Sequence, residues 1–281
     1  MSAHPPLSPW ATDHEGRHAL PDGPPDALYE RPPKAGTVYL VGAGPGDPGL
    51  LTCRGRALIE AADVVLHDAL ISAAIMAVIP PRTERINVGK RRGKHLVEQH
   101  RIGDLLIAQA RRERIVVRLK GGDPLVFGRG AEEMAQLRAA GVPYEVVPGV
   151  TVAVAGPAMA GIPITHRGLS GAVTFVTGHD AATDRKAVGW HSLAGTDHTL
   201  VILMGLKKLP TIAAKLIAAG RDPDTPAAVI QDATLASQRV VTGRLSSIAE
   251  RVVAAGIRSP ATVVVGPVAA LHAQLAWKDG P

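Results

Sequence analysis

The segment from Val38 to Gly49 constrains the fold of this chain more than any other stretch. It reads VYLVGAGPGDPG, so a run of β-forming residues leads directly into a loop built almost entirely of glycine and proline. Glycine has no Cβ and tolerates positive φ, which lets the backbone of such a loop approach a ligand closely. The alternative is a tight turn between a strand and a helix that holds no ligand.

The spacing of this loop does not fit a dinucleotide-binding fingerprint. A G-x-G-x-x-G pattern that begins at Gly42 and Gly44 needs a third glycine where this chain has Asp47. A carboxylate there would repel a pyrophosphate, and Pro45 and Pro48 stiffen the segment where a phosphate-binding helix should begin. The sequence therefore favours a ligand without phosphate, held by backbone groups and shape.

The composition supports a globular chain with an aliphatic core. Of the 281 residues, 46% are hydrophobic and only 3% are aromatic, and the single cysteine, Cys53, excludes an internal disulfide and a cysteine-based zinc site. The sequence contains no uncharged apolar run of about 18 residues, the length expected of a membrane span. The N-terminus also lacks the pattern of a signal peptide. We therefore expect a cytoplasmic protein that does not bind a membrane.

The formal net charge of +6 is compatible with nucleic acid, an anionic membrane surface or a polyanionic small substrate as partner. The low aromatic content leaves few platforms for base stacking, and no nucleic-acid-binding motif is present, so we expect no nucleic acid. The densest basic run, residues 90–95, follows a predicted strand, at a position where open α/β sheets bind ligands. A solvated surface is the alternative for this run and the favoured interpretation of residues 111–114.

Composition and periodicity divide the chain into three parts. Residues 1–35 are rich in proline and poor in aliphatic residues, which predicts a disordered extension. Over residues 36–149 strand-like and helix-like segments alternate, which predicts a mostly parallel sheet covered by helices. Over residues 150–277 strands follow one another directly, which predicts a mixed sheet. The expected fold is thus α/β, with two α/β domains joined near residues 148–156.

Hydrophobic periodicity also predicts the individual elements. In the first domain the expected strands are 38–41, 63–67, 85–88, 115–119 and 144–147, and the expected helices are 51–61, 71–78, 98–111 and 130–140. In the second domain the expected strands are 173–177, 199–204, 226–231, 239–241 and 261–265, with helices at 210–219 and 245–254. Ligands of such sheets bind at the carboxyl ends of the strands, so the glycine-rich exits there are candidate sites.

Several residues at these exits could carry chemistry. The exit after residue 119 reads KGGDP, in which Gly121 and Gly122 permit close backbone approach and Asp123 can accept hydrogen bonds. Asp68 and Lys90 follow two other strands and could act as a general base and its partner, although a surface ion pair looks the same in sequence. No histidine has metal-ligand spacing with a second ligand, so we expect no metal.

Four motifs together resemble the tetrapyrrole methylase family. They are VGAGPGDP at 41–48, VRLKGGDP at 117–124, VPGVT at 147–151 and GIPITHR at 161–167, in the order found in that family. The resemblance extends from about residue 37 to residue 277 and leaves the N-terminal extension outside it. It implies two α/β domains with S-adenosylmethionine bound in the cleft between them, and a homodimer.

The resemblance also implies which residues meet the cofactor. The matching positions are Pro45, Gly121, Gly122, Asp123, Val126, Thr151, Val152, Met204 and Ala233. Ala233 stands where glycine is common and is expected to make its contact through the backbone, and Val152 replaces the family's usual alanine. S-adenosylhomocysteine would be the form of the cofactor that remains after methyl transfer.

On the substrate side, the resemblance assigns proton transfer to Asp68 and Lys90. The positions that line the tetrapyrrole pocket are matched by Arg129, Glu132, Arg167 and His179. The family's usual Asp-Arg-Leu reads Asp-Ala-Leu at residues 68–70, so one carboxylate-binding arginine is absent. A neighbour such as Arg91 or Arg92 could compensate for it.

The reaction implied by the resemblance is methyl transfer to C2 and then C7 of uroporphyrinogen III. It gives precorrin-2 by way of precorrin-1, for sirohaem or cobalamin biosynthesis. A substrate with eight carboxylates would account for the basic balance of the chain. The alternatives are another precorrin methyltransferase of the same fold, a cofactor-binding protein without activity and, more distantly, a basic nucleic-acid-binding module.

Overall fold

The computed structural model describes residues 31–89, 99–178 and 188–277. The predicted disorder of residues 1–30 lies outside these ranges, as do the predicted site residues Lys90 and His179. The chain from Ala35 onward is one compact unit. Within the described ranges, no helix combines the length and apolar character needed to cross a bilayer.

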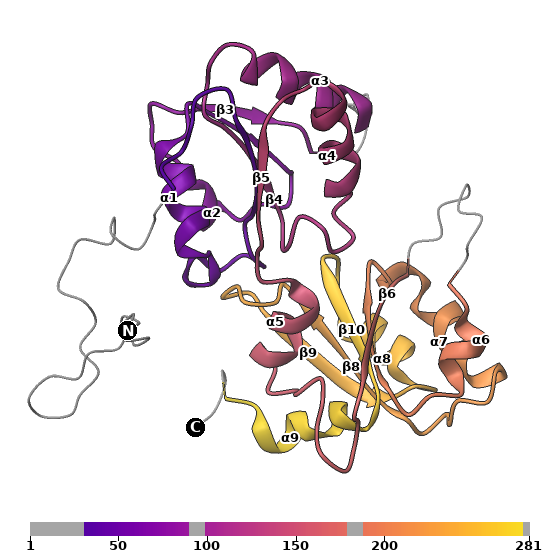
Figure 1. Ribbon diagram of the computed structural model, residues 1–281. Helices are drawn as coiled ribbons and strands as arrows, with labels where there is room; N and C mark the ends of the chain where they lie inside the picture. Colours follow the sequence, from indigo (N-terminus) through magenta and orange to yellow (C-terminus); the bar gives the residue numbers. More distant parts are fainter. Residues whose placement is uncertain (1–30, 90–98, 179–187, 278–281) are drawn as a thin grey trace, which may run out of the picture. The chain divides into compact units, whose positions relative to one another are not determined.

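Five parallel strands form the first sheet, in the order β3-β2-β4-β1-β5 (Figure 1). The strands are β1 (Val38–Gly42), β2 (Val64–His67), β3 (Glu84–Asn87), β4 (Val116–Lys120) and β5 (Tyr144–Val147). Strand β1 pairs with β4 and β5, and β2 pairs with β3 and β4, always in parallel. Parallel neighbours need crossover connections, and helices supply them here, as the alternating pattern predicts.

Helices cover both faces of this sheet. They are α1 (Cys53–Ala61), α2 (Ala73–Met76), α3 (Gln99–Ala110) and α4 (Gly130–Ala139), with the short 3-10 helix η2 (Pro48–Leu50) before α1. In Figure 1, α1 and α2 lie on one side of the sheet and α3 and α4 on the other. Tyr39 and Val41 pack with Leu58 on the first side, whereas Leu40 packs with Leu106 on the second. Burial on both faces explains why β1 and β2 are almost continuously apolar, whereas the edge strand β3 is polar and largely exposed.

The second sheet is mixed, as predicted, with the strand order β6-β7-β10-β8-β9. Its strands are β6 (Val173–Thr177), β7 (Thr199–Leu203), β8 (Pro226–Gln231), β9 (Arg239–Arg244) and β10 (Ala261–Val265). Strands β6 and β7 are parallel, whereas β10 runs antiparallel to β7 and β8, and β9 antiparallel to β8. Short connections suffice for the antiparallel pairs, which is why β9 follows β8 without a helix.

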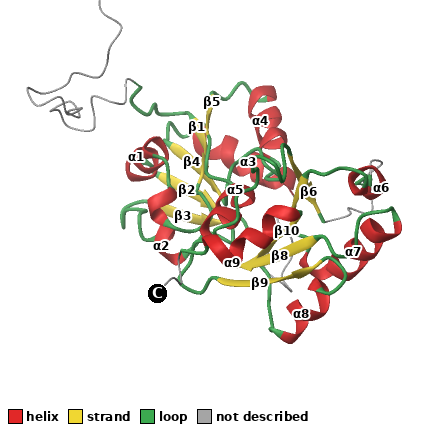
Figure 2. Ribbon diagram, turned by 90° about the horizontal axis from the view of Figure 1, so that it is seen from below, coloured by secondary structure: helices red, strands yellow, loops and turns green. Residues whose placement is uncertain are grey.

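Helices also cover both faces of the second sheet (Figure 2). They are α5 (Val152–Met159), α6 (Trp190–Ala194), α7 (Leu209–Ala218), α8 (Ile248–Ala254) and α9 (His272–Leu275), with 3-10 helices η3 (Leu206–Lys208) and η4 (Pro267–Leu271). Helices α6, α7 and α8 contribute to one core cluster, which includes Trp190 and Ile212. On the opposite face, Ala153 of α5 packs with Val201, and Val268 of η4 packs with Val264.

Helix α5 occupies the stretch where the sequence suggested a connection between domains. Gly156 and Pro157 argue against a helix by propensity, yet both are buried within it. Thr151 caps the helix by accepting a hydrogen bond from the Ala153 N–H at 3.3 Å, and Ala153 packs against β7 residues. Tertiary packing therefore overrides the local signal. A domain boundary at residues 149/150, which would make α5 the first element of the second domain, remains our proposal.

The carboxyl ends of β1, β4 and β5 meet backbone to backbone. A Cβ on Gly42 would lie 2.5 Å from the Cα of Gly149, and a Cβ on Gly149 would lie 2.2 Å from the carbonyl oxygen of Gly122. Gly122 and Gly44 also exchange backbone hydrogen bonds of 2.8 and 3.2 Å. Since neither Gly42 nor Gly149 has room for a side chain, this contact fixes the loops that follow the three strands.

We expect Gly149→Ala to lower the free energy of unfolding by about 1–3 kcal/mol, because the new methyl group would force the backbone of the neighbouring exits apart. Urea denaturation measures the change. The matched control is Gly195→Ala, because Gly195 has a φ of −78° and its added Cβ would meet no atom within 4 Å. The control should change stability by less than about 1 kcal/mol. Equal losses in the two variants would contradict the steric explanation.

Candidate active site

The exits of the first sheet enclose a cavity of about 390 Å³. It lies at the carboxyl ends of parallel strands, where open α/β sheets bind their ligands. It brings together four of the residues predicted from sequence, namely Asp68, Gly121, Val126 and Arg129. The remaining lining residues are Ala69, Leu70, Val88, Gly89, Ile102, Arg118, Lys120, Phe127 and Gly128.

Asp68 is bound to a charge cluster behind the cavity. Its Oδ1 accepts a hydrogen bond of 2.6 Å from Nη2 of Arg118. Nε of Arg118 also donates to Oε1 of Glu133 at 3.1 Å, and Nζ of Lys120 donates to the same oxygen at 3.0 Å. The side chains of Arg118, Lys120 and Glu133 are at most 3% exposed, whereas that of Asp68 is 32% exposed.

The local structure explains how these charges meet. Side chains alternate along a strand, so Arg118 and Lys120 point from the same face of β4, toward the side covered by α3 and α4. Glu133 lies in the first turn of α4, where the helix dipole favours an acid. The sequence analysis did not identify Arg118, Lys120 or Glu133 as site residues. The available signal was a pair of basic residues two apart on a buried strand, which requires a buried acid nearby.

Burial lowers the pKa of Lys120 below its ordinary value of 10.5. The neighbouring guanidinium of Arg118 acts in the same direction, whereas the carboxylates of Glu133 and Asp68 act to raise the pKa. The ammonium group lies at the wall of the cavity and is held by Glu133.

Other predicted residues have structural partners of their own. Asp123 accepts hydrogen bonds from the N–H of Leu125 at 2.8 Å and from the N–H of Gly149 at 3.1 Å. Its carboxylate therefore connects the loop after β4 to the exit of β5. Arg129 and Glu132 form an exposed two-bond ion pair of 2.8 and 2.6 Å, and this pair raises the pKa of Arg129 and lowers that of Glu132.

Among the described residues, five of the six non-glycine residues with left-handed backbone follow strands, and the sixth, Glu113, precedes β4. Phe127 and Arg129 follow β4 with φ values of 52° and 57°, Met204 follows β7 with 56°, and Asp232 and Thr234 follow β8 with 48° and 74°. Such conformations cost about 1–3 kcal/mol each for most residues and cluster at functional sites. Met204, a predicted cofactor position, belongs to this set, and Ala233, another predicted position, lies between two of its members.

A hydrogen bond connects the first glycine-rich loop to the exit of β8. The N–H of Asp47 donates to Oγ1 of Thr234 at 3.2 Å, and a Cβ on Gly46 would lie 2.8 Å from the side chain of Leu235. Pro45, another predicted cofactor position, is in the same loop. A direct contact thus joins the two loops that carry the predicted cofactor positions Pro45 and Ala233.

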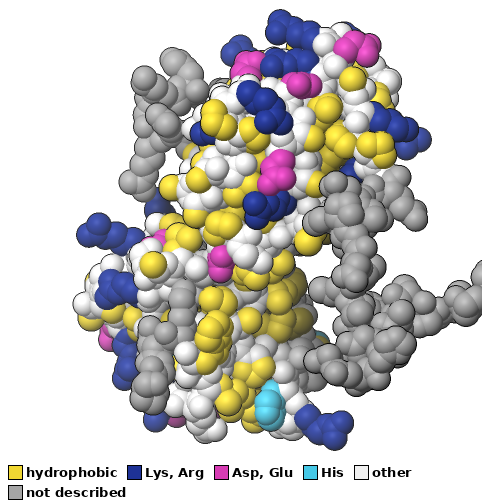
Figure 3. All heavy atoms as spheres, turned by 90° about the vertical axis from the view of Figure 1, so that its left-hand side faces the viewer, with side chains coloured by type: hydrophobic (Ala, Val, Ile, Leu, Met, Phe, Trp, Pro, Cys, Tyr) yellow, Lys and Arg dark blue, Asp and Glu magenta, His cyan; other side chains and the backbone are white. Residues whose placement is uncertain are grey.

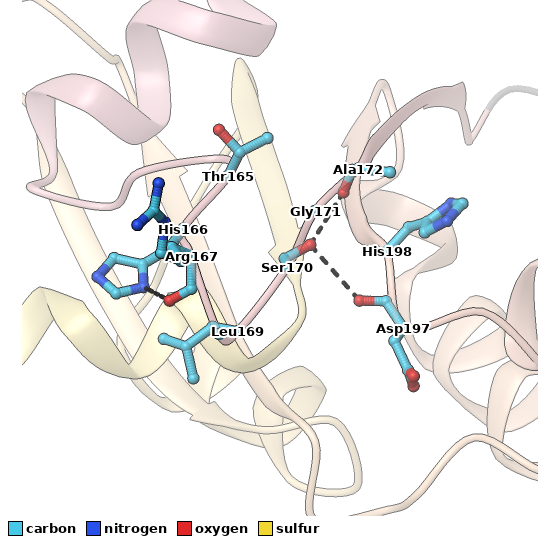
Figure 4. Close-up of a pocket in the computed structure, with 10 residues that line it drawn as sticks. Thr165, His166, Arg167, Leu169, Ser170, Gly171, Ala172, Asp197 and His198 are labelled. Atoms are coloured by element: carbon cyan, nitrogen blue, oxygen red, sulfur yellow. Dashed lines mark hydrogen bonds between the residues drawn. The ribbon is translucent and has the colours of Figure 1, made fainter.

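Arg167 lines a different and larger cavity of about 850 Å³, formed by residues 165–172, Asp197 and His198 (Figure 4). This cavity lies beside the amino ends of β6 and β7, because its lining residues directly precede these strands. Nδ1 of His166 lies 2.7 Å from the carbonyl oxygen of Arg167. The hydroxyl of Ser170 donates to the carbonyl of Ala172 at 2.9 Å. Arg167 and Arg129, both predicted to bind substrate, therefore line separate cavities.

No cluster of three or more His, Cys, Asp or Glu side chains among the described residues could hold a metal ion.

Comparison with known proteins identifies the family. Residues 37–249 match the Tetrapyrrole (Corrin/Porphyrin) Methylases. A uroporphyrinogen-III C-methyltransferase of Synechocystis sp. is 47% identical over 247 residues, which cover 88% of this chain and 94% of that protein. A siroheme synthase of Pseudomonas aeruginosa is 49% identical over 247 residues, which cover 87% of this chain and 52% of that protein. This chain thus spans about half the length of the siroheme synthases that it matches.

A solved structure confirms the two-domain α/β fold. The uroporphyrin-III C-methyl transferase of Thermus thermophilus, complexed with S-adenyl homocysteine, aligns with a TM-score of 0.72 at 41% sequence identity. The alignment covers 84% of this chain and 99% of that one.

The lowered pKa of Lys120 predicts a pH dependence of stability. Between the pKa of the folded chain and that of the unfolded chain, the unfolded chain binds more protons, so the free energy of unfolding rises with pH. Lys120→Gln lacks this contribution. We expect the wild-type advantage over Lys120→Gln to increase as the pH rises toward the ordinary lysine value of 10.5 and to level off above it. Urea unfolding at several pH values measures it, and a difference that does not vary with pH would contradict the prediction.

Proposed function

This chain belongs to the tetrapyrrole methylase family, and we propose that it is an S-adenosylmethionine-dependent uroporphyrinogen-III C-methyltransferase. It would transfer methyl groups to C2 and then C7 of uroporphyrinogen III and release precorrin-2, a precursor for sirohaem or cobalamin. The cavity that brings together Asp68, Gly121 and Arg129 at one sheet edge supports this proposal.

The open space over the backbone of Gly121 supports our proposal of a ligand in this cavity. A Cβ built on Gly121 would meet no atom within 4 Å, and its backbone is outside the left-handed region. Neither packing within the protein nor φ therefore requires glycine at this position. The open space over its backbone is available to a ligand that approaches from the cavity. The residues present thus fit a bound cofactor.

We infer that the cofactor lies across the strand exits of both sheets, in the cleft between the proposed domains. Its contacts would come from the first loop, the KGGDP loop, the start of α5 and the strained exits of β7 and β8. The residues in this proposal are Pro45, Gly121, Gly122, Asp123, Val126, Thr151, Val152, Met204 and Ala233. The hydrogen bond from the first loop to the β8 exit supports a common site. When bound, S-adenosylmethionine supplies an activated methyl group on its sulfonium.

The proposed reaction depends mainly on how the enzyme positions the two reactants. A pyrrole carbon is already electron-rich, so the enzyme has to align it with the methyl donor rather than create a strong nucleophile. It must also accept a proton lost from the macrocycle. Asp68 is the proposed base, because its carboxylate lines the cavity, is partly exposed and is held by Arg118. Lys90 keeps its proposed role in proton transfer, although it lies outside the described residues.

Substrate recognition would depend on the substrate's carboxylates. Arg129 lines the cavity beside Gly121 and is half-exposed, so a substrate carboxylate can reach its guanidinium, which Glu132 orients. Guanidinium groups bind carboxylates in a two-bond geometry, which favours this role. Arg167 and His179 complete the proposed set, and the second cavity would then have to be continuous with the substrate path. We also propose a homodimer and a cytoplasmic location, both on the strength of the family resemblance.

The face drawn in Figure 3 gives little support to the nucleic-acid alternative. On the face drawn in Figure 3, the Lys and Arg side chains of the described residues are dispersed, and acidic side chains lie among them. Nucleic-acid-binding surfaces concentrate basic residues on one face or stripe. This face does not have that distribution.

Anaerobic incubation with uroporphyrinogen III and S-adenosylmethionine tests the proposal. We expect mass spectrometry to show a product with two added methyl groups. With ¹³C-methyl cofactor, NMR should place these methyl groups on C2 and C7. Reactions without cofactor are the control. Methylation of a later precorrin, with none of uroporphyrinogen III, would instead assign the chain to another member of the family.

We expect Asp68→Asn to lower kcat by about 10²–10⁴-fold, the range typical of a general base, while the affinity for S-adenosylmethionine changes little. Single-turnover kinetics and calorimetric titration of the cofactor measure the two quantities. Asp104→Asn is the control, because Asp104 is an exposed residue of α3 that pairs with His100. An equal loss of cofactor affinity in Asp68→Asn would remove Asp68 from the chemical step.

A further inference from the structure

Glu133 is the central residue of the charge cluster behind the cavity. Its side chain is fully buried, and its Oε1 accepts hydrogen bonds from both Arg118 and Lys120. Arg118 uses one nitrogen, Nε, for Glu133 and another, Nη2, for Asp68. The guanidinium therefore connects a buried carboxylate to the carboxylate that lines the cavity.

Stability alone does not explain this arrangement. Removing the Glu133 carboxylate and two cations from water has a large desolvation cost, and replacing a buried ion cluster by apolar residues is often neutral or stabilising. The rest of this face of the sheet is apolar, with Val38, Leu40, Leu66 and Val116 in one core cluster. Among the buried strand residues that the structure describes on this face, charges occur at the end of β4 that faces the cavity, on Arg118 and Lys120.

The geometry of Arg118 indicates what the cluster does. A guanidinium is planar, so fixing Nε on Glu133 also fixes the direction of Nη2. That direction holds Asp68 by one oxygen, Oδ1, at 2.6 Å, while the carboxylate remains partly exposed to the cavity. Arg118 also donates to the backbone carbonyl of Leu119 at 3.2 Å, which further restricts its movement. Lys120 balances the second negative charge.

We propose that Glu133 is a positioning residue for Asp68, which acts through Arg118 to hold the reacting carboxylate in one orientation at the cavity wall. This inference rests on the proposed function, in which Asp68 accepts a proton from the macrocycle. Glu133 itself does not touch substrate or cofactor. Its contribution would appear in turnover and not in the binding of either ligand.

Glu133→Gln tests the proposal, because glutamine preserves the shape of the side chain and removes its charge. We expect kcat to fall by about 10-fold, which corresponds to about 1.4 kcal/mol of lost transition-state stabilisation. The KM for the tetrapyrrole and the affinity for S-adenosylmethionine should stay within about 2-fold of wild type. An unchanged kcat, or a loss that appears only in KM or in cofactor affinity, would overturn the proposal.

A double-mutant cycle separates positioning from a general structural effect. If Glu133 acts through Asp68, then Glu133→Gln should have little further effect on kcat in the Asp68→Asn background. If both backgrounds lose activity by the same factor, Glu133 acts independently of Asp68 and the proposal is wrong. Full turnover in Asp68→Asn alone would overturn both this inference and the proposed role of Asp68.

Glu145→Gln is the control for the loss of an ion pair, at a pair whose side chains are 19% and 25% exposed. Glu145 of β5 pairs with Arg54 of α1 at 3.1 Å, so the same substitution breaks another ion pair between the first sheet and a helix, away from the cavity residues. We expect kcat to be unchanged in this variant. An equal fall in kcat would show that any such ion pair matters, and would overturn the specific role of Glu133.

Arg118→Lys is the second variant, and it decides the matter if Glu133→Gln does not fold. Lysine keeps the buried charge but cannot reach two carboxylates in a fixed fork. We expect the same fall in kcat and the same insensitivity in the Asp68→Asn background, and wild-type turnover would overturn the proposal. All cycles are measured on the tetrapyrrole that the wild type methylates. Failure with uroporphyrinogen III would therefore overturn the proposed substrate and leave the test of Glu133 decisive.

Discussion

The backbone contact between the ends of β1, β4 and β5 is the constraint on which the site depends. Gly42 and Gly149 approach so closely that neither has room for a Cβ, and the carbonyl of Gly122 lies against both. Asp123 adds a hydrogen bond from its carboxylate to the Gly149 N–H. Because these loops are tied to one another, the wall of the cavity formed by the KGGDP loop has a defined position relative to the first glycine-rich loop.

The buried charge cluster behind the cavity is a second constraint on the same sheet edge. The cluster of Arg118, Lys120 and Glu133 places charges in a core region that is otherwise apolar. Burial of this kind is expensive unless every charge is paired, so the cluster tolerates few arrangements. The result is a rigid support for Asp68 on one side of the cavity. The glycine contact supports the other side, and the two together preorganise the site.

The residues of the motifs were predictable, and their partners were not. Asp68, Gly121, Val126 and Arg129 line one cavity, in agreement with the sequence prediction that strand exits meet. Glu133 escaped notice because an acid in the first turn of a helix usually lies on the surface and stabilises the helix dipole. Helix α5 escaped notice because glycine and proline near its centre lower its propensity, and only packing against the second sheet stabilises it.

Periodicity and motif spacing are local properties of the chain, so they were enough to predict the α/β class, the parallel first sheet, the mixed second sheet and the family. The tertiary structure decided which charges meet. Arg118 and Glu133 are 15 residues apart, and Asp68 is 50 residues from Arg118. Such pairings depend on strand order and on the face that each side chain takes. Tertiary structure also put Arg129 and Arg167 on separate cavities, because Arg129 follows β4 of the first sheet, whereas Arg167 precedes β6 of the second.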